Sequence, residues 1–390
     1  MRGVRPHPFG KGKEHGPERS GIGRPSGHGP PRSAARRAAI RRPDETGPAR
    51  DVSENRPVQT VQPLCTGRKA GKENMTEFGL IEHIRRLCGL QPPGDFEGIG
   101  DDCAVLPVGG GESLVFTTDL LCEGVHFLRH ATTARELGGK ALAVNLSDVA
   151  SMGATPVATL LSLSLPPDAT GPWAEEFAAG YCDASARWGT ALVGGDTTAS
   201  ASGITVSVTA IGRAADAHIK RRSAACAGDV ILTAGRLGAS AAGLRDLLAG
   251  RLDTPLAAIH RNPVPQTAEG AWLGTRPEVH AMMDLSDGLA SDICRIMEQS
   301  HTGAEIDLER IPTDDGADLR TALCGGEDYK LLLTAAPHGA ETLCADFLAH
   351  FGTPLYPVGR ITPSQEGQSG PVWLLRGERQ RLRFEGFEHF

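Results

Sequence analysis

The sequence predicts a mixed α/β protein with two domains, and three observations support this. Segments with strand-like and helix-like patterns alternate from residue 113 onward. The chain has 390 residues, which is enough for two domains with substantial cores. A polar segment at residues 220–229 ends in a turn signal between two such series. We therefore expect domains at 75–222 and 223–390, the first rich in β-strands, after an extension at 1–74.

The first 74 residues differ from the rest in composition. They are rich in Gly, Pro, Arg and Ser and carry 16 Lys and Arg against 7 Asp and Glu. With so little apolar material to bury, the segment is expected to be disordered, and it lacks the apolar stretch of a secretory signal. A transit peptide or a basic arm that touches nucleic acid remains an alternative. Ordinary helical patterning begins at Met75, which we take as the working start.

The remaining residues are acidic, because the whole chain has 40 Lys and Arg against 47 Asp and Glu. This balance argues against nucleic-acid binding and suits a protein that gathers divalent cations. No run approaches the roughly 18 apolar residues of a membrane span. Nine cysteines are scattered without a C-x-x-C pair, so a reduced, cytoplasmic protein is expected.

The elements are expected in the following order. A helix begins at Met75, and period-two alternation predicts a strand over 204–212. Further strands in the first domain are expected over 113–119, 158–166 and 190–198, the last running into a turn. Its other helices are expected over 133–153, apolar nearly all round and therefore buried, and over 173–189. The second domain is expected to begin with the segment 229–238, and in it we expect strands over 279–284 and 329–335 and a helix over 288–300.

Aspartates recur beside apolar segments, at strand ends or Gly/Ser/Thr turns. The motifs are GIGDDC, FTTDLL, NLSDVA, VGGDTT, MDLSDG and GGEDY. Each alone is an ordinary solvated turn, but six beside apolar segments point to a shared site. Asp148 is on a helix without a clear polar face, and a buried carboxylate needs a proton, a cationic side chain or a metal. Since basic residues are sparse beside these motifs, we expect a metal; Lys140 is among the few plausible phosphate partners.

The ligand types indicate which metal and which substrate. Carboxylates and hydroxyls are hard donors that suit Mg²⁺, Mn²⁺ or Ca²⁺, and Mg²⁺ held by few carboxylates usually serves phosphates. The glycines let backbone N–H groups approach phosphate oxygens, and MDLSDG leads into a helix N-terminus. Ser286 or Asp287 capping that helix is the structural alternative, and both roles can coexist. The sequence has no P-loop, G-x-G-x-x-G or H-E-x-x-H motif.

Taken together, the motifs resemble the thiamine-monophosphate kinase family of the aminoimidazole ribonucleotide synthetase-like superfamily. The resemblance rests on GIGDDCAVL, TTDLLCEGVHF, KALAVNLSDVASMGA, LVGGDTT, MDLSDGLASD and ALCGGEDY, in order along residues 75–390, and on the ending GFEHF. It does not extend to residues 1–74. The family turn often has N-H-F where this chain has V-H-F, which leaves His126 in place.

This resemblance implies ATP-dependent phosphorylation of thiamine monophosphate to thiamine diphosphate with several Mg²⁺ ions. It also implies a homodimer whose N-terminal domains join strands into a barrel, with an α/β C-terminal domain beside each. The implied metal ligands are Asp102, Thr117, Thr118, Asp119, Asp148, Asp196, Asp284 and Asp287. The implied nucleotide contacts are Gly195, Asp196, Arg222 and Ser286. The implied thiamine monophosphate contacts are His126, Glu327 and an aromatic residue near the C-terminus, Phe387.

Physical chemistry favours direct in-line transfer, because phosphoryl transfer needs charge neutralisation and alignment rather than a covalent intermediate. Within the DD pair we expect Asp102 to turn inward to the metal and Asp101 to shape the turn. Two alternatives stay open, an aminoimidazole ribonucleotide synthetase-like ligase and a non-catalytic nucleotide- or thiamine-phosphate-binding protein. Selenophosphate synthetase-like activity would need a reactive cysteine in a glycine-rich setting that Cys65 lacks. A hydrogenase-maturation role would need a C-terminal cysteine, whereas this chain ends in Phe390.

Overall fold

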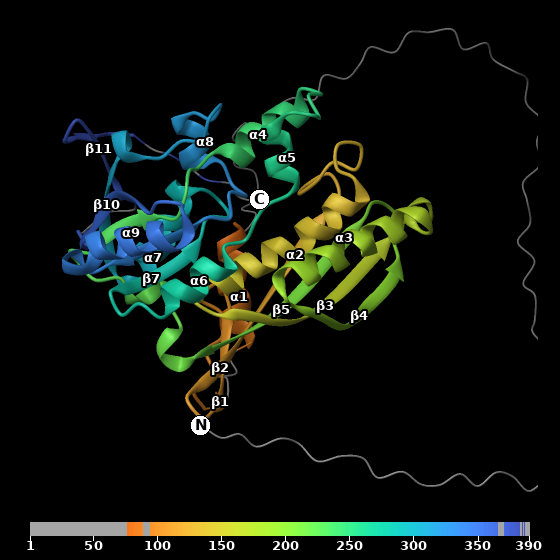
Figure 1. Cartoon of the computed structure of the whole chain (residues 1–390), viewed down its shortest axis with the longest axis horizontal. Coiled ribbons are helices and arrows are strands. Elements are labelled where there is room, and N and C mark those ends of the chain that lie inside the picture. The colour runs from red at the N-terminus through yellow and green to blue at the C-terminus, as the bar shows by residue number, and fades with distance from the viewer. Residues whose placement is uncertain (1–75, 89–93, 366–369, 383, 385, 387–390) are drawn as a thin grey trace, which may run out of the picture. The chain divides into compact units, whose positions relative to one another are not determined.

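The computed structural model describes residues 76–88, 94–365, 370–382, 384 and 386. The extension at 1–74 and the aromatic Phe387 lie outside the described residues. Within them the mixed α/β class is confirmed: there are two sheets, both open, and helices pack on each (Figure 1). No helix among the described residues combines the length and the apolar character needed to cross a membrane.

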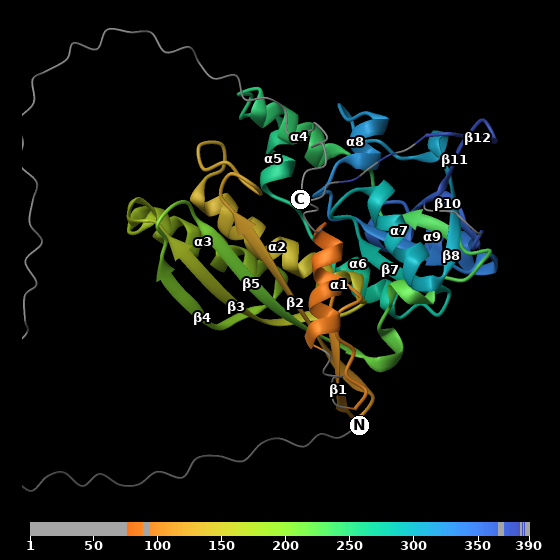
Figure 2. The ribbon, with the colours of Figure 1, turned by 180° about the vertical axis from the view of Figure 1, so that it is seen from behind.

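The first sheet has five strands in the order β1-β2-β5-β3-β4, antiparallel except for the parallel pair β3–β4. The strands are β1 (Ala104–Gly109), β2 (Glu112–Cys122), β3 (Thr155–Leu165), β4 (Ala191–Ala199) and β5 (Thr205–Ala215). Helices α2 (Ala134–Ser151) and α3 (Pro172–Trp188) cover one face. The opposite face of β3, β4 and β5, here called the outer face, is seen in Figure 2.

Alternation of side chains explains how this sheet is covered. Along β5, Val206, Val208 and Ala210 are buried against the helices, and the intervening residues point to the outer face. The expected strand over 204–212 is therefore confirmed. On the edge strand β4 every residue is exposed. The outer face and the β4 edge are thus the uncovered parts of the sheet.

Helix α2 connects the two sheets. Thr133 and Glu136 form a capping box at its N-terminus, and fourteen of its 18 residues are buried. It contacts β2, β3 and β5 of the first sheet and also β7 and α6 of the second half. The expectation of a buried helix over 133–153 is confirmed, and the reason for its burial is that elements pack on it from both halves of the chain.

The second sheet has seven strands in the order β12-β11-β8-β10-β6-β9-β7. These are β6 (Val230–Thr233), β7 (Val279–Asp284), β8 (Thr302–Asp307), β9 (Leu331–Ala335), β10 (Tyr356–Pro363), β11 (Val372–Leu375) and β12 (Glu378–Gln380). The helices of this half are α4 (Ala239–Leu248), α5 (Pro255–Arg261), α6 (Thr267–Gly274), α7 (Leu289–Ser300), α8 (Leu319–Cys324) and α9 (Pro337–Phe351). The expected strand over 279–284 and the expected helix over 288–300 are confirmed.

The remaining elements are short or peripheral. Helix α1 (Glu77–Cys88) confirms the helical patterning that begins at Met75, and it lies on the side of the first sheet away from α2 and α3 (Figure 2). Four short 3₁₀ helices occur in the connections. They are η1 (Pro167–Ala169), η2 (Asp216–His218), η3 (Arg222–Ala224) and η4 (Leu308–Arg310).

Two expectations about the acidic motifs were wrong. The strand expected to end at Asp119 continues to Cys122, and the motif VGGDTT lies inside β4 rather than in a turn. Gly195 makes the second possible, because its φ of 152° and its close approach to β3 exclude a side chain; a Cβ would lie 1.7 Å from the Leu161 carbonyl oxygen. Asp119 and Asp196 are therefore strand residues, and the face of the sheet decides what each can reach.

Candidate active site

Three carboxylates from distant parts of the chain meet beside α2. Asp102 lies just before β1, Asp148 is on α2, and Asp284 ends β7. Each offers an oxygen atom within 4.8 Å of the others. Asp119 on β2 is close enough for its charge to raise the pKa of Asp148. Its backbone N–H donates to Asn145 Oδ1 of α2 at 2.9 Å. These four aspartates are here called the carboxylate cluster.

Hydroxyl groups hold three of these carboxylates in place. Ser151 Oγ donates to Asp102 Oδ2 at 2.7 Å, and Ser147 Oγ donates to Asp284 Oδ2. Thr117 Oγ1 on β2 donates to Asp148 Oδ2. Ser147, Asp148 and Ser151 all belong to α2, so one helix orients the whole group. The sequence reasoning missed Ser147 and Ser151, although both lie in the motif that contains Asp148.

The cluster carries more negative charge than its surroundings neutralise. Burial, and then repulsion from Asp102, raises the pKa of Asp284 to about 8 and that of Asp119 to about 6. Burial, and then repulsion from Asp119 and Asp284, raises the pKa of Asp148 well above its ordinary value. With a pKa of about 8, Asp284 holds a proton at neutral pH unless a cation enters the cluster.

One side-chain cation does reach the cluster, which corrects the expectation that basic residues are sparse beside these motifs. The guanidinium of Arg222 pairs with Asp102 and lies 3.7 Å from Asp101 Oδ1. Asp102 faces the cluster with its side chain 2% exposed, whereas Asp101 accepts hydrogen bonds from the backbone N–H groups of Asp102 and Arg222, both at 3.1 Å. A single arginine cannot neutralise four carboxylates.

The donor set fits a hard divalent cation. Its donors are carboxylate oxygens arranged around one point, and hydroxyl groups hold the carboxylates in place. A bound cation would lower the raised pKa values of these carboxyls. No thiol takes part. Asp102, Asp148 and Asp284 are therefore the residues that would hold Mg²⁺, with Asp119 beside them.

Two of the expected ligands point elsewhere. Thr118 donates its hydroxyl to the Val208 carbonyl and is exposed on the outer face. Asp196 lies across the sheet from Ser162, Ser207 and Leu120, also on the outer face. Three strand spacings, about 14 Å, separate it from the β2 backbone beside Asp119. Within one chain, neither side chain joins the carboxylate cluster.

The turn after β7 carries two further expected residues, Ser286 and Asp287. The carboxylate of Asp292 on α7 accepts from the backbone N–H groups of Asp287 and Gly288 at 3.2 and 3.0 Å, which fixes this turn. The sequence reasoning did not select Asp292, although it belongs to the motif MDLSDGLASD. The N-cap of α7 is Gly288, without a side-chain cap hydrogen bond, so the capping role considered for Ser286 or Asp287 was wrong.

The expected substrate residues His126 and Glu327 lie near one another, and buried Lys140 joins them. Its Nζ is 2.9 Å from Glu327 Oε1 and donates to the His126 carbonyl at 3.4 Å. The His126 ring accepts the Cys122 N–H at Nδ1, which places its own proton on Nε2. From the sequence Lys140 is a plausible phosphate partner, and its contact with Glu327 was not predicted; a lysine inside an apolar helix was the available signal.

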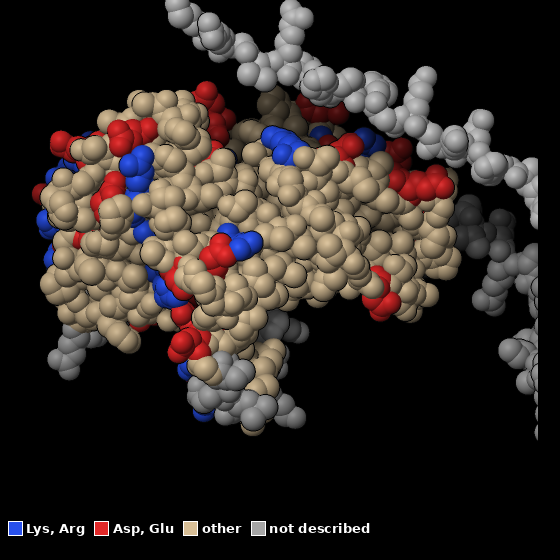
Figure 3. Space-filling model, turned by 60° about the horizontal axis from the view of Figure 1, so that its bottom comes forward, with Lys and Arg blue, Asp and Glu red and all other residues tan. Residues whose placement is uncertain are grey.

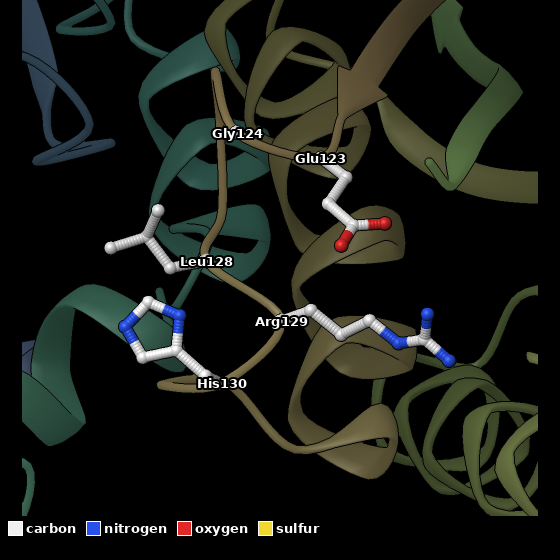
Figure 4. A pocket seen from close by; sticks show the side chains of 5 residues that line it. All are labelled: Glu123, Gly124, Leu128, Arg129 and His130. Atoms are coloured by element: carbon white, nitrogen blue, oxygen red, sulfur yellow. The ribbon is translucent and has the colours of Figure 1, made fainter. Parts of the chain in front are cut away.

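The loop that carries His126 also borders a hollow of about 390 Å³. It is lined by Glu123, Gly124, Leu128, Arg129 and His130 (Figure 4). The Arg129 guanidinium is held by Asp168 at 3.0 Å, and Glu123 accepts from the Ile204 N–H at 2.9 Å. No member of the carboxylate cluster lines this hollow, so it is a feature of the loop rather than of the metal site.

Comparison with known proteins identifies the family. The chain matches the models of AIR synthase related protein, N-terminal domain over residues 100–214 and C-terminal domain over residues 227–370. The thiamine-monophosphate kinase of Escherichia coli (strain K12) is 38% identical over 311 residues, which cover 75% of this chain and 91% of that protein. The chain belongs to the thiamine-monophosphate kinase family. The resemblance seen in the motifs is thereby confirmed.

Solved structures of thiamine-monophosphate kinases agree over nearly their full length. AaThiL complexed with AMPPCP and TMP superposes with a TM-score of 0.69 at 30% identity, covering 81% of this chain and 97% of that one. Thiamine-monophosphate kinase from Stenotrophomonas maltophilia K279a gives 0.62 at 36% identity, covering 78% and 98%. Asp102, Asp119 and Asp148 fall in the N-terminal family domain and Asp284 in the C-terminal one. The carboxylate cluster of this family member therefore forms where the two domains meet.

Proposed function

We propose that this chain transfers the γ-phosphate of ATP to thiamine monophosphate and so forms thiamine diphosphate. The observation that carries the proposal is the agreement with AaThiL complexed with AMPPCP and TMP, an ATP analogue and, in this family, thiamine monophosphate. The carboxylate cluster supports it, because this chain places its hard oxygen donors where two phosphate-bearing substrates would need cations. The reaction is phosphotransfer with a phosphate as acceptor.

The residues present supply binding and orientation. Asp102, Asp148 and Asp284 would hold Mg²⁺, with Asp119, Thr117 and Asp287 nearby in the expected ligand set. When bound, Mg²⁺ neutralises phosphate charge and so lets one phosphate approach another. Arg222, released from Asp102 once a metal takes that carboxylate, would turn to the nucleotide phosphates. Ser286 and the turn at the start of α7 would contribute polar groups on the same side.

Direct transfer remains the proposed route. One serine in the described residues does contact a histidine, since Ser240 Oγ lies 2.9 Å from His260 Nδ1. The carboxylate of Glu327 approaches that same nitrogen at 3.4 Å. A nucleophile–base–acid relay needs the two nitrogens of the histidine ring to face different partners, and here both partners face Nδ1 of His260. Ser240, His260 and Glu327 therefore do not form such a relay. The Ser240 hydroxyl is also fully buried, so it does not serve as a phosphoryl acceptor.

We further propose that the enzyme is a homodimer joined through the outer face of the first sheet into a barrel. Leu120, Val157, Leu160 and Val193 are exposed there, and Figure 3 shows a broad area of this side with few charges. The unpaired edge of β4 is a further reason, because free backbone groups favour pairing. Gly195 and Asp196, expected at the nucleotide, lie on this strand, so they would serve a site formed with the partner copy.

ADP release measured with alternative acceptors tests the proposed activity. With ATP and Mg²⁺, ADP should form with thiamine monophosphate and not with free thiamine, since the acceptor is a phosphate. Turnover with formylglycinamidine ribonucleotide instead would favour the aminoimidazole ribonucleotide synthetase-like alternative. Binding of both ligands without ADP would favour a non-catalytic binding protein. Localisation in the cytoplasm is part of the same proposal, because the eight described cysteines are free.

A further inference from the structure

Lys140 is a buried cation in α2, the helix that connects the two sheets. It lies in the middle of α2 with 1% of its surface exposed, among residues that are otherwise small or apolar. A buried ammonium is costly unless charge and hydrogen bonds compensate it. Its compensation is specific: Nζ is 2.9 Å from Glu327 Oε1 and 3.4 Å from the His126 carbonyl oxygen. One ammonium therefore touches both residues that are expected at thiamine monophosphate.

Glu327 is held in an uncommon backbone conformation to make this contact. Its φ is 63°, a left-handed value that non-glycine residues seldom adopt, and its N–H donates to the Ser286 carbonyl at 2.8 Å. The preceding Gly326 passes so near the same carbonyl that a Cβ would lie 2.4 Å from the oxygen. Such strain persists where surrounding structure enforces it and is concentrated at functional sites. Here it directs the carboxylate toward α2, next to the turn that follows Asp284.

The second oxygen of Glu327 faces a neutral group. His260 Nδ1 lies 3.4 Å from Oε2, and burial together with Lys140 lowers the pKa of His260 to about 4. Lys140 therefore supplies the positive charge at neutral pH. Burial alone would raise the pKa of Glu327, but attraction to Lys140 and a hydrogen bond from it lower that pKa. The carboxylate stays ionised, and 22% of its side chain remains exposed to a ligand.

We propose that Lys140 is a positioning residue for the organic cation of the substrate. This inference rests on the proposed function. Lys140 fixes the Glu327 carboxylate and the His126 loop across the domain junction. The positively charged thiazolium ring of thiamine monophosphate then meets a preorganised negative group. Lys140 belongs to the N-terminal family domain and Glu327 to the C-terminal one. The subsite is consequently complete only when both domains are docked on α2.

The chain offers a matched control in Lys220. This lysine is also buried, at 6% exposed, and it also bridges to the second half of the chain. Among the described residues its Nζ donates to the carbonyls of Arg276 and Val279, both at 2.8 Å, and to no carboxylate. Removing either ammonium should lower thermal stability, but only Lys140 acts on Glu327.

Steady-state kinetics of the full chain test the proposal, with thiamine monophosphate and ATP varied separately. Lys140→Met should raise KM for thiamine monophosphate by about tenfold or more, the usual effect of losing a hydrogen bond to a charged group, with KM for ATP nearly unchanged. Lys140→Arg should recover most of the loss. Lys220→Met should lower the melting temperature but leave KM for thiamine monophosphate within about twofold.

A double-mutant cycle covers the case in which Lys140→Met folds poorly. Glu327→Gln alone should already weaken the binding of thiamine monophosphate and raise its KM. Adding Lys140→Met should then change this KM little, because the pair acts as a unit. Equal effects of Lys140→Met on both substrates, or full additivity with Glu327→Gln, would overturn the positioning role. Failure of the wild-type enzyme to use thiamine monophosphate would instead overturn the proposed function and this inference with it.

Discussion

Ser147 on α2 donates its hydroxyl to the carboxylate of Asp284, which follows 137 residues later at the end of β7. Both partners are buried, and the bond joins the two domains at the carboxylate cluster. Asp148, the next residue along α2, faces the same cluster. The aspartates of the two domains are therefore brought together by one helix, and the predictions below concern the charge gathered there.

Removing charge from the cluster should abolish most of the activity. Asp148→Asn or Asp284→Asn keeps the side-chain shape but removes a negative charge from the metal site. Turnover at limiting Mg²⁺ should fall by about a hundredfold or more, since several kcal/mol of transition-state stabilisation depend on the ion. Asp101→Asn is the matched control and should cost much less, because Asp101 shapes the turn. Rates for Asp148→Asn and Asp284→Asn that equal those of Asp101→Asn and of the wild type would contradict a metal site here.

The stability of the metal-free protein should fall as pH rises. The pKa of Asp284 is about 8 in the folded chain and near 4 when unfolded, so the folded state binds the extra proton between these values. The stabilisation is complete below about pH 4 and is lost as pH rises through about 8. Thermal unfolding without metal should show this decline, and Mg²⁺ should raise the melting temperature more at pH 8 than at pH 6. Asp284→Asn should flatten the decline.

Arg222 and Arg221 are adjacent arginines with different partners, which makes them a useful pair. Arg222 meets Asp102 in the cluster, whereas Arg221 pairs with Glu97 at 2.6 Å outside it. Arg222→Met should raise KM for ATP by about tenfold, as for loss of a charge-assisted hydrogen bond. Arg221→Met should leave that KM nearly unchanged. An unaltered KM for ATP in Arg222→Met would remove Arg222 from the nucleotide site.

A charge on the outer face should separate the dimer. Val193 is 62% exposed on β4, and Val193→Asp would place carboxylates against each other across the proposed contact. Size-exclusion chromatography with light scattering should give the mass of one chain, with loss of most activity because Asp196 would no longer reach a partner site. Leu248→Asp, on α4 at 66% exposed, is the control and should stay dimeric. A fully active Val193→Asp monomer would refute the shared site.

Local patterns predicted most of the elements that carry the site. The run VHAMMD is a strand with the bounds expected, and the apolar circumference of α2 indicated a helix packed from all sides. Such features follow from hydrophobic periodicity, which is set by neighbours in the sequence. The aspartates could likewise be selected because Asp148 had no plausible solvent-facing role.

Long-range partners could not be predicted in the same way. Arg222 lies 120 residues from Asp102, and nothing near either residue indicates their pairing. The direction of Asp196 depends on its register with Ser162 and on the continuation of the strand through Gly195, which reads as a turn residue. The pairing of Lys140 with Glu327 could not be predicted either, because an uncommon backbone conformation places the Glu327 carboxylate.

The most direct measurement of the central claim follows the γ-phosphate of ATP itself. The full chain is incubated with γ-labelled ATP, Mg²⁺ and thiamine monophosphate, and the labelled products are separated. We predict that the label appears in thiamine diphosphate in step with ADP formation, and that free thiamine accepts none. Label released only as inorganic phosphate, or transferred equally well to free thiamine, would contradict the assignment of this chain as a kinase of thiamine monophosphate.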